Sequence, residues 1–369
     1  MLKDIVIEKR FELLPYIAGN FSGKRAQAQA PFDFDKLNPN AGLGVNLDLN
    51  KTSTLEITMN PDFSQVEADV TQIDINSSYA LEYPERRPFF NRGTDVVDFI
   101  DGAFYSRSIN NPLVSSKLLT QGQKSRIYFL TALDQNSPYT VASEDRSYFG
   151  EGGQSFVNVL RYQHLFSKNT RMGVVTTNRY YQNGGFSNLF GTDGRFILSK
   201  NWQLNYEVFT NKNLEPTSNW IDSEDVLISK TAALDGETFS GTALYLQLFH
   251  NTEHWKSSLA LSSLSPHYQA NVGFVVKNNR RWVSLKQQYQ NFINKKGLQF
   301  FSVGYKGDLQ YTPQGEFKTL SIDGIVELRT FFNTSIEYTY DFDVKKDYLD
   351  RLYYNLGIHQ IDMRSTPSE

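Results

Sequence analysis

The stretch 299–311, QFFSVGYKGDLQY, decides the fold because its side chains alternate between apolar and polar with a period of two. Successive side chains of a β-strand point to opposite faces of the sheet, so this period predicts a strand with one apolar and one polar face. The apolar face consists of Phe301, Val303, Tyr305, Leu309 and Tyr311, and the polar face of Ser302, Gly304, Lys306, Asp308 and Gln310.

The same alternation recurs at 43–49, 55–60, 202–208 and 332–342. Several of these runs approach the roughly 9–11 residues with which a tilted strand crosses a bilayer. Strands of soluble sandwiches are shorter, about 5–6 residues, and small and charged residues on the polar faces suit a water-filled lumen. No stretch of a dozen residues shows helical spacing of its apolar positions. The pattern therefore predicts an all-β fold, an antiparallel transmembrane β-barrel of the outer-membrane type with roughly a dozen or more strands.

The composition of the 369 residues agrees with this fold class. The chain contains 27 Phe and 21 Tyr, yet its mean hydropathy is −0.46 and no apolar run is long enough for a membrane helix. A barrel combines these properties because its apolar residues occupy only alternate positions, with aromatic residues at both interfaces. The net charge of −3 gives no basic field for a nucleic acid, and the absence of cysteine excludes disulfides and thiolate metal sites.

Short polar turns and long polar loops alternate along the chain, as they do at the two ends of an outer-membrane barrel. The long loops include 182–191 and 211–238, and the pattern fails at 311–333, where two turn-like sequences require a missing strand between them. The start of the chain has no signal peptide and its polar end lacks a closing strand. We therefore expect a single, incomplete barrel domain over 1–369, cut at both ends.

Acidic residues gather in and after the segment 60–90, NPDFSQVEADVTQIDINSSYALEYPERRPFF. Hard oxygen ligands at this density could hold Ca²⁺, although their spacing is not that of an EF-hand. Paired carboxylates could also act as general acid and base in glycoside hydrolysis. The candidate carboxylates are Asp62, Glu67 and Asp69, and, as the metal-site candidates, Asp95, Asp98 and Asp101.

We favour a structural interpretation of the segment 60–110, a plug folded into the lumen and held by ion pairs. Pro84 and Pro88 fix the backbone and remove two donors, so the chain leaves the β-ladder there. Guanidinium groups pair with carboxylates through two parallel hydrogen bonds, and two aromatic side chains would anchor the segment. The predicted network comprises Asp62, Glu67, Asp69, Glu85, Arg86, Arg87 and Arg92, with Phe89 and Phe90 as anchors.

Other motifs carry little chemistry. His250 and His254 form a bare i, i+4 pair across a predicted turn, and we interpret them as solvated or interfacial imidazoles rather than metal ligands. The glycine-rich 150–155, GEGGQS, lacks the lysine and helix of a phosphate-binding loop and is typical of a hairpin end.

Three ordered motifs resemble a known family. NPDFSQVEAD (60–69), PERRPFF (84–90) and FYSR (104–107) are similar to the hallmark of outer-membrane β-barrel proteins of uncharacterised function from gliding and polymer-degrading Gram-negative bacteria. In that family a carbohydrate-binding domain resembling family 9 precedes the barrel. Here this domain is missing, and the family's Leu-Glu-Gly is replaced at 91–93 by Asn-Arg-Gly. The resemblance implies a bacterial outer-membrane location and a tie to carbohydrate.

These observations lead to three functional hypotheses. The favoured one is a pore or binding platform in outer-membrane lipid, for glycans or their breakdown products, with lumen positions such as Tyr245, Gln247, Gln288 and Gln290 suited to sugars. The others are a barrel-embedded glycan hydrolase, which would depend on Glu67 or Asp69, and a scaffold that binds partners in a surface complex. The sequence does not decide whether the chain is an enzyme, and the patterns favour a non-enzymatic role without a resident cofactor.

Overall fold

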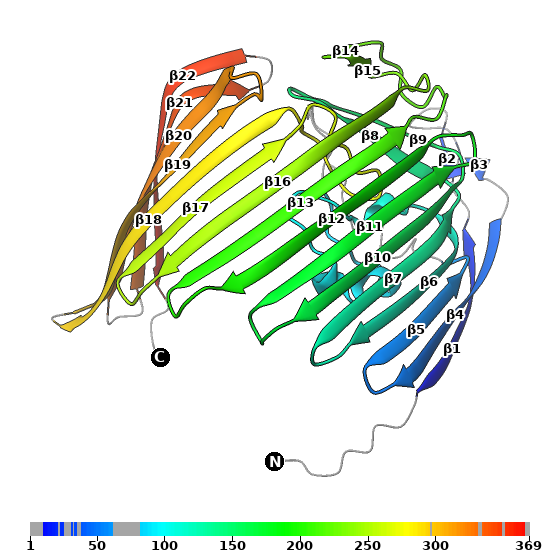
Figure 1. The fold of residues 1–369 in the computed structure, drawn as a ribbon, viewed down its shortest axis with the longest axis horizontal. Coiled ribbons are helices and arrows are strands. Elements are labelled where there is room, and N and C mark those ends of the chain that lie inside the picture. The colour runs from blue at the N-terminus through cyan, green and yellow to red at the C-terminus, as the bar shows by residue number, and fades with distance from the viewer. Residues whose placement is uncertain are drawn as a thin grey trace, which may run out of the picture.

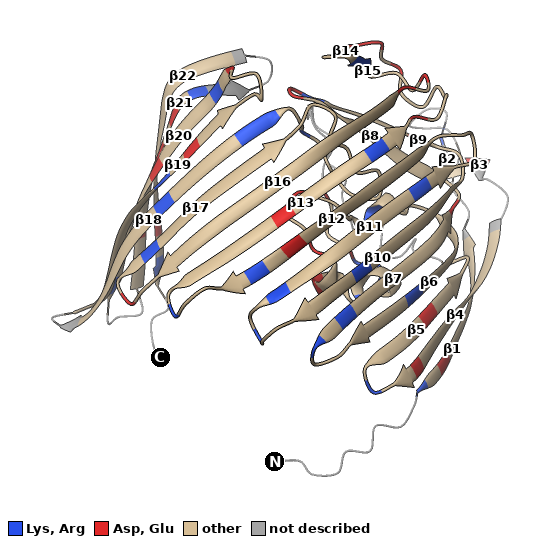
Figure 2. Ribbon diagram, in the orientation of Figure 1, with Lys and Arg blue, Asp and Glu red and all other residues tan. Residues whose placement is uncertain are grey.

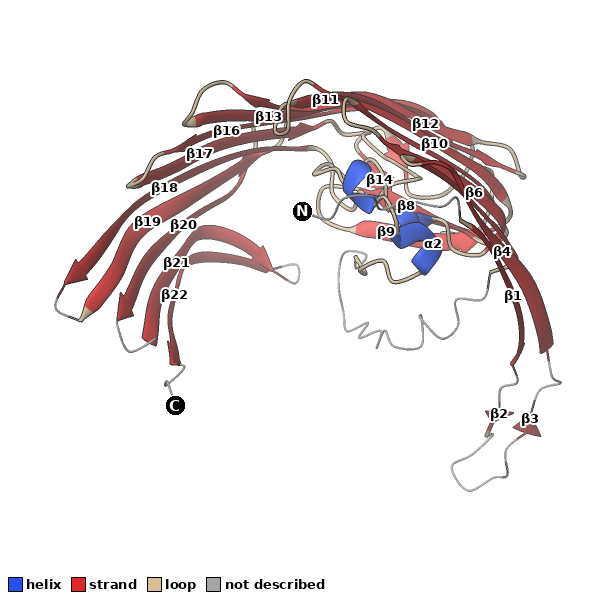
Figure 3. Cartoon of the chain, turned by 90° about the horizontal axis from the view of Figure 1, so that it is seen from below, coloured by secondary structure: helices blue, strands red, loops and turns tan. Residues whose placement is uncertain are grey.

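One antiparallel sheet of 16 strands forms the body of the molecule and curves into an open arch (Figures 1 and 3). The computed structural model describes residues 10–20, 23–25, 31, 33–34, 38–61, 82–295, 297–330, 334–348 and 351–365. The strand order follows the chain order, so each strand pairs with the strands before and after it in the sheet. Among the described residues, β1 and β22 are the two edges of the sheet, and they do not pair with each other.

The strands of the large sheet are mostly 10 to 16 residues long. Their bounds are β1 Phe11–Asn20, β4 Asn38–Asn50, β5 Ser53–Met59, β6 Pro112–Gln121, β7 Ser125–Asp134, β10 Ser155–Leu165, β11 Arg171–Tyr181, β12 Phe186–Ile197, β13 Trp202–Leu214, β16 Thr238–Asn251, β17 Trp255–Leu264, β18 Arg280–Lys295, β19 Leu298–Tyr311, β20 Phe317–Thr330, β21 Thr334–Tyr348 and β22 Arg351–Ser365.

Short elements lie outside the large sheet. Three small hairpins pair β2 (Gly23–Lys24) with β3 (Asp33–Phe34), β8 (Ser137–Ala142) with β9 (Ser147–Gly152), and β14 (Val226–Leu227) with β15 (Lys230–Thr231). The helical turns are α2 (Pro88–Asn91) and the 3-10 turns η1 (Thr94–Val96) and η2 (Ser106–Ser108). Within the described residues, no helix is long and apolar enough to cross a membrane.

Polarity alternates along the strands as the sequence predicts. In β10, Val157 and Val159 are fully buried on the concave face, whereas Phe156 and Leu160 on the convex face are each 47% exposed. In β16, Tyr245 is buried and the adjacent Leu244 is 39% exposed. The convex face of the arch is therefore rich in exposed large apolar side chains, which a water-soluble protein would bury.

The structure confirms the all-β antiparallel fold, in a sheet that does not close within the described residues, and it contains the strand that the sequence interpretation lacked. The expected strands at 43–49, 55–60, 202–208, 299–311 and 332–342 correspond to β4, β5, β13, β19 and β21. The missing strand in the 311–333 region is β20, which resolves the conflict between its two turn-like ends. GEGGQS (150–155) runs from β9 into β10, as expected for a hairpin end.

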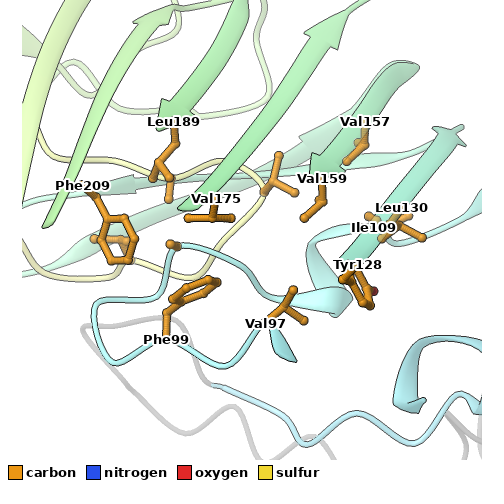
Figure 4. Packing of buried hydrophobic residues seen from close by; sticks show 14 of the residues in the cluster. Val97, Phe99, Ile109, Tyr128, Leu130, Val157, Val159, Val175, Leu189 and Phe209 are labelled. Carbon is orange, nitrogen blue, oxygen red and sulfur yellow. The ribbon is translucent and has the colours of Figure 1, made fainter. Parts of the chain in front are cut away.

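The largest cluster of buried apolar side chains lies on the concave face, between the sheet and segments folded against it (Figure 4). Val97, Phe99 and Ile109 come from the chain before β6, and they pack on inward side chains of β6 to β13 such as Leu130 and Phe209. Figure 3 shows the helical turns inside the arch. Burial of this apolar surface is what attaches these segments to the sheet.

Candidate functional site

The segment 82–111, called the inner segment below, crosses the concave face of the arch (Figure 3). Pro88 begins the short helix α2, and the 3-10 turns η1 and η2 follow, so only a few of its backbone groups bond within the segment. Buried backbone N–H and C=O groups need partners from elsewhere. Charged side chains of the sheet provide them.

Lysine and arginine side chains of the sheet donate to carbonyl groups of the inner segment. The Nζ of Lys117 in β6 donates to the carbonyl of Phe89 and, at 3.0 Å, to that of Arg92. The Nε of Arg161 in β10 donates to the carbonyl of Val96 at 3.2 Å. Arg179 in β11 donates to the carbonyl of Ser108 at 2.5 Å.

Carboxylates of the sheet accept from N–H groups of the same segment. Glu207 in β13 accepts from the amides of Ile100, at 3.0 Å to each oxygen, and of Asp101, at 3.2 Å. Asp134 at the end of β7 accepts from the amides of Asn110 and Asn111, at 3.2 and 2.7 Å. The backbone of the inner segment is thus held by charge-assisted hydrogen bonds along its length, from 89 to 111.

Ion pairs within the concave face neutralise most of these buried charges. Lys117 lies 2.9 Å from Glu56, which also binds Arg92 at 3.0 Å. Arg161 binds Asp193 through two guanidinium nitrogens, one of them at 2.7 Å. A buried charge without a partner costs several kcal/mol, so these pairs permit the charged side chains to remain inside.

Arg179 and Asp134 form a fourth, looser pair, whose nitrogen and oxygen are 3.7 Å apart. Both side chains are fully buried, and each is also bonded to the inner segment. The sheet therefore fixes the inner segment at the level of η2 as well as at α2.

The inner segment also contains its own ion pair. Arg87, with 1% of its side chain exposed, binds Glu85 at 2.7 Å and donates to the carbonyls of Ile109 and Ser106 at 2.7 and 2.9 Å. Burial opposes ionisation of Glu85, but the hydrogen bonds and charge of Arg87, with a hydrogen bond from Ser106, hold the pKa of Glu85 below its usual value. This pair ties the beginning of the segment to its end.

The loop 265–279 between β17 and β18 crosses the inner segment at two glycines. The amide of Phe274 donates to the carbonyl of Gly102 at 2.9 Å, and a Cβ on Gly273 would lie 1.9 Å from that same oxygen. Gly102 has φ of +64°, where a side chain is strained. Only glycine fits this crossing, which joins two segments far apart in sequence.

Asp101 lies beside this crossing, and only 7% of the residue is exposed. Burial raises the pKa of Asp101 to about 6, and the positive charge of Arg280 partly opposes that effect. The backbone carbonyl of Asp101 accepts from the hydroxyl of Tyr268 at 3.2 Å. Asp101 is therefore a proton-binding group inside the attachment region.

A cavity of about 380 Å³ opens on the inner segment itself. Aromatic and acidic side chains line it, among them Tyr83, Phe104, Tyr105, Asp95 and Asp98. A small polar solute would fit a space of this size and lining.

The structure brings together part of the predicted network. Glu85 pairs with Arg87, and Arg92 pairs with Glu56 of the sheet rather than with a nearby acid in sequence. Phe90 is fully buried beneath the guanidinium of Arg87. Phe89 is partly buried and Arg86 is exposed. Asp62, Glu67 and Asp69 lie outside the described residues.

The structure does not bring together the metal-site candidates Asp95, Asp98 and Asp101. Asp95 is 3.3 Å from Arg126, Asp98 is exposed and Asp101 is buried. Their spacing of three would place them on one side of a helix, but the backbone at 94–101 is one 3-10 turn followed by a bend. In the described part of the chain, the group of three acidic residues whose carboxylate oxygens all lie within 4.8 Å of one another is Glu215, Asp235 and Glu237.

That acidic group already has a cation. Lys230 lies 3.0 Å from Glu215, and both side chains are almost completely buried. Burial raises the pKa of Glu215 to about 6, and Lys230 partly opposes this effect. The cluster is therefore an internal ion pair of the loop 215–237.

The predicted lumen positions Tyr245, Gln247, Gln288 and Gln290 share the parity of the buried side chains of β16 and β18, which places them on the concave face. Gln288 donates to Ser302 at 3.2 Å, and Gln290 donates to the carbonyl of Glu253 at 3.0 Å.

His250 stacks on Trp202 at 4.4 Å between ring centroids, in agreement with an interfacial role.

Sequence reasoning missed the sheet residues that hold the inner segment. These are Glu56, Lys117, Asp134, Arg161, Arg179, Asp193 and Glu207. A signal was present in β10, where Arg161 continues the inward face of Val157 and Val159. A charged side chain that follows buried apolar side chains on the same face indicates a buried polar partner.

One family model matches the first third of the chain. Residues 8–129 match the model of a domain of unknown function, DUF5916; the match runs from β1 through the inner segment and ends within β7. No curated protein matches the sequence. The presence of a carbohydrate-binding domain in related proteins stays a prediction.

Several solved structures resemble the chain at low sequence identity. They include three proteins of Pseudomonas aeruginosa, the outer membrane proteins OprD (10% identity, 97% of this chain and 96% of that chain, TM-score 0.38) and OpdK (11%, 96% and 89%, 0.38), and OpdQ (10%, 96% and 94%, 0.39). At these values the similarity carries no argument about function.

Proposed function

We propose that this chain forms the wall of a β-barrel in the bacterial outer membrane and acts as a pore for polar solutes, with the inner segment narrowing its lumen. The observation that carries the proposal is that one continuous sheet exposes large apolar side chains on its convex face, whereas its concave face carries charged and polar side chains and an apolar patch covered by the inner segment. A sheet in water would bury its apolar face, whereas a sheet in lipid exposes it.

The convex face supports a position in lipid. Its exposed side chains include Leu259, Leu261, Val283 and Leu285 on two adjacent strands, at 36 to 40% exposure. Strands of 10 to 16 residues, such as β6 and β18, are long enough to cross a hydrocarbon layer at a tilt.

Aromatic side chains near the short turns support the same position. Phe166, Trp202 and Trp255 are 60%, 41% and 50% exposed at the turns that join β10 to β11, β12 to β13 and β16 to β17. Trp255 packs against Tyr289 of the next strand, with 5.2 Å between ring centroids. Amphipathic rings prefer the interface between lipid and water, so these residues fit one of the two aromatic belts of a barrel.

The concave face supports passage of polar solutes. Beyond the part covered by the inner segment, charged positions lie on β19 to β21 (Figure 2), and the inward side chains there include Lys306, Asp308, Asp323, Glu327, Glu337 and Asp341. Charged and amide side chains on a wall suit a hydrated lumen and not a packed core. We propose glycans as the class of solute. The side chains that would contact them are Tyr245, Gln247, Gln288 and Gln290.

Single-channel recording in planar bilayers tests the proposal. We expect a small unit conductance from the wild-type chain and a larger one from Arg179→Met, which loosens the inner segment. Arg329→Met is the matched control, because it removes the same charge from the inward face of β20 away from the inner segment. Hydrogen exchange of residues 94–111 shows independently whether the segment has loosened.

Two results would oppose the proposal. Absence of conductance from folded, reconstituted protein, in the wild type and in Arg179→Met, would refute the pore. A conductance that stays the same while exchange shows a released segment would refute the narrowing role of the inner segment.

A further inference from the structure

Four arginines converge on the concave face at the end of the sheet that carries the short turns. They are Arg126 near the start of β7, Arg161 in β10, Arg171 at the start of β11 and Arg195 near the end of β12. Each has the parity of the buried, inward side chains of its strand. Figure 2 shows the blue Lys and Arg positions on the lower parts of these strands.

Two of these arginines face each other directly. Arg171 and Arg195 are partners in the register of β11 and β12, a position at which side chains of adjacent strands lie within about 4.5–5.5 Å of one another at Cβ. Like charges directly opposite each other destabilise a sheet. Among the charges that act on Arg171, three are the guanidinium groups of Arg195, Arg126 and Arg161, and one is the carboxylate of Asp193.

The carboxylates of this region are already engaged. Asp193 accepts two hydrogen bonds from Arg161, whose guanidinium lies over Gly173, where an added Cβ would be 2.6 Å from its Nη1. Asp95 is paired with Arg126 at 3.3 Å. Within the described part of the chain, Arg171 and Arg195 have no carboxylate at salt-bridge distance, and the Nε of Arg195 is buried without a hydrogen-bond partner.

We propose that Arg171 and Arg195, with Arg126 at the rim, form an anion-binding subsite for an oxyanion group, a carboxylate or phosphate, of a solute in the lumen. Guanidinium groups present donors in a fixed fork that matches such groups with two bonds each. A bound oxyanion would offset the repulsion between the facing arginines and supply the acceptor that Nε lacks. The role in a solute's path rests on the proposed pore, but binding itself does not require conductance.

The opposite charge on another part of the wall favours this location. Asp323 and Asp341 are in register across β20 and β21 on their inward faces, with Asp308 and Asp343 near them and Lys306 as the nearby cation. An anionic group would be repelled there and attracted to the arginines of β11 and β12. A solute with one anionic group would thereby acquire a preferred orientation.

Binding of inorganic phosphate and of acetate to the refolded protein tests this subsite. Isothermal titration and urea unfolding would be performed at constant ionic strength, so that screening is the same in every sample. We expect saturable binding of at least one of the two anions, and at least tenfold weaker binding in Arg171→Gln/Arg195→Gln. Lys286→Gln, an inward charge of β18 away from the cluster, is the control and should bind as the wild type does.

The stability of the double variant without added anion separates a ligand site from an internal ion pair. If the subsite awaits a ligand, Arg171→Gln/Arg195→Gln relieves repulsion, and its urea midpoint equals or exceeds that of the wild type. A lower midpoint would show that another carboxylate of the chain already fills the cluster, which would overturn the proposal. Unchanged phosphate and acetate binding in the double variant, or no saturable binding by the wild type, would also overturn it.

The two proposals can fail separately. Anion binding without single-channel conductance would support the anion-binding subsite and refute the pore. Single-channel conductance without anion binding would support the pore and refute the subsite.

Discussion

Replacement of Arg161 by methionine should weaken attachment of the inner segment more than any change of an exposed arginine. Its side chain is 1% exposed, binds Asp193 through two nitrogens and donates to the carbonyl of Val96 at 3.2 Å. Its guanidinium also lies 5.0 Å from the ring centroid of Phe99. Arg161→Met keeps an unbranched apolar stem but leaves the carboxylate of Asp193 and the carbonyl of Val96 without these donors.

The size of the effect follows from burial. Removing one partner of a buried ion pair costs about 3–5 kcal/mol. Asp193 keeps 14% of its side chain exposed and can regain some water, so the low end, about 3 kcal/mol, is expected. The pair of Arg329 with Glu327 is also 2.7 Å long, but the Arg329 side chain is 54% exposed, and such pairs contribute about 0–1 kcal/mol.

Urea unfolding in micelles, followed by tryptophan fluorescence, measures the free energy, and hydrogen exchange of residues 94–104 reports attachment of the inner segment. Adding Asp193→Asn to Arg161→Met should recover part of the loss, because no unpaired carboxylate remains. Equal losses of stability in Arg161→Met and Arg329→Met would refute the reasoning that the sheet holds the inner segment through buried charges.

Three further predictions concern the same region. Gly273→Ala should destabilise the protein by about 3 kcal/mol or more in urea unfolding, because the added Cβ would lie 1.9 Å from a backbone oxygen. Gly307→Ala is the control and should cost about 1 kcal/mol or less, because its Cβ would have its nearest neighbouring atom at 4.0 Å. Equal costs would contradict the close contact between Gly273 and Gly102. Arg87→Met should destabilise the protein by about 3–5 kcal/mol in the same assay, because Arg87 is buried together with the carboxylate of Glu85. Arg86→Met should cost less than about 0.5 kcal/mol, because Arg86 is exposed. A similar loss in both variants would show that the ion pair of Arg87 with Glu85 is not buried. Burial raises the pKa of Asp101 from 3.8 to about 6, so the folded state keeps a proton that the unfolded chain releases. The free energy of unfolding should therefore fall by up to about 3 kcal/mol as the pH rises from about 4 to about 6. Asp101→Asn should flatten this dependence of stability on pH. An unchanged dependence in that variant would exclude Asp101 as its cause.

The strands could be predicted because their side chains alternate with a period that local geometry imposes. Residues 299–311 show this most clearly, and β19 covers nearly the same range. β20 was missed although Ile322, Val326 and Leu328 share its outward face. Gly324 interrupts that row of apolar side chains, and a weak alternation between two turn-like sequences does not stand out in a single sequence.

The contacts of the inner segment could be predicted only in part. Pro84 and Pro88 correctly indicated a departure from the β-ladder, and the pair of Glu85 with Arg87 is local in sequence. The bonds from Arg161 and Glu207 join residues 65 and 107 positions apart, and no local pattern specifies such distances. Arg86 and Arg87 are adjacent and chemically identical, and only the fold distinguishes the exposed one from the buried one.

The predicted carboxylate site shows a different limit. Spacing in sequence identifies neighbours only when the backbone conformation is known. Asp95, Asp98 and Asp101 would share one side of a regular helix, yet the chain there forms a single 3-10 turn and then bends around Phe99, which is buried against Phe209. Tertiary packing, not the spacing of the acids, determines where each carboxylate lies.

The central claim is that the convex face lies in lipid while the concave face lines a hydrated lumen. The chain contains no cysteine, so single cysteines can be introduced one at a time along β16 and labelled with a nitroxide. In reconstituted vesicles, oxygen dissolved in lipid should accelerate the spin relaxation of labels at 244, 246 and 248, and should not do so for labels at 243, 245 and 247. Equal access of a water-soluble nickel complex to both sets of positions would contradict the account.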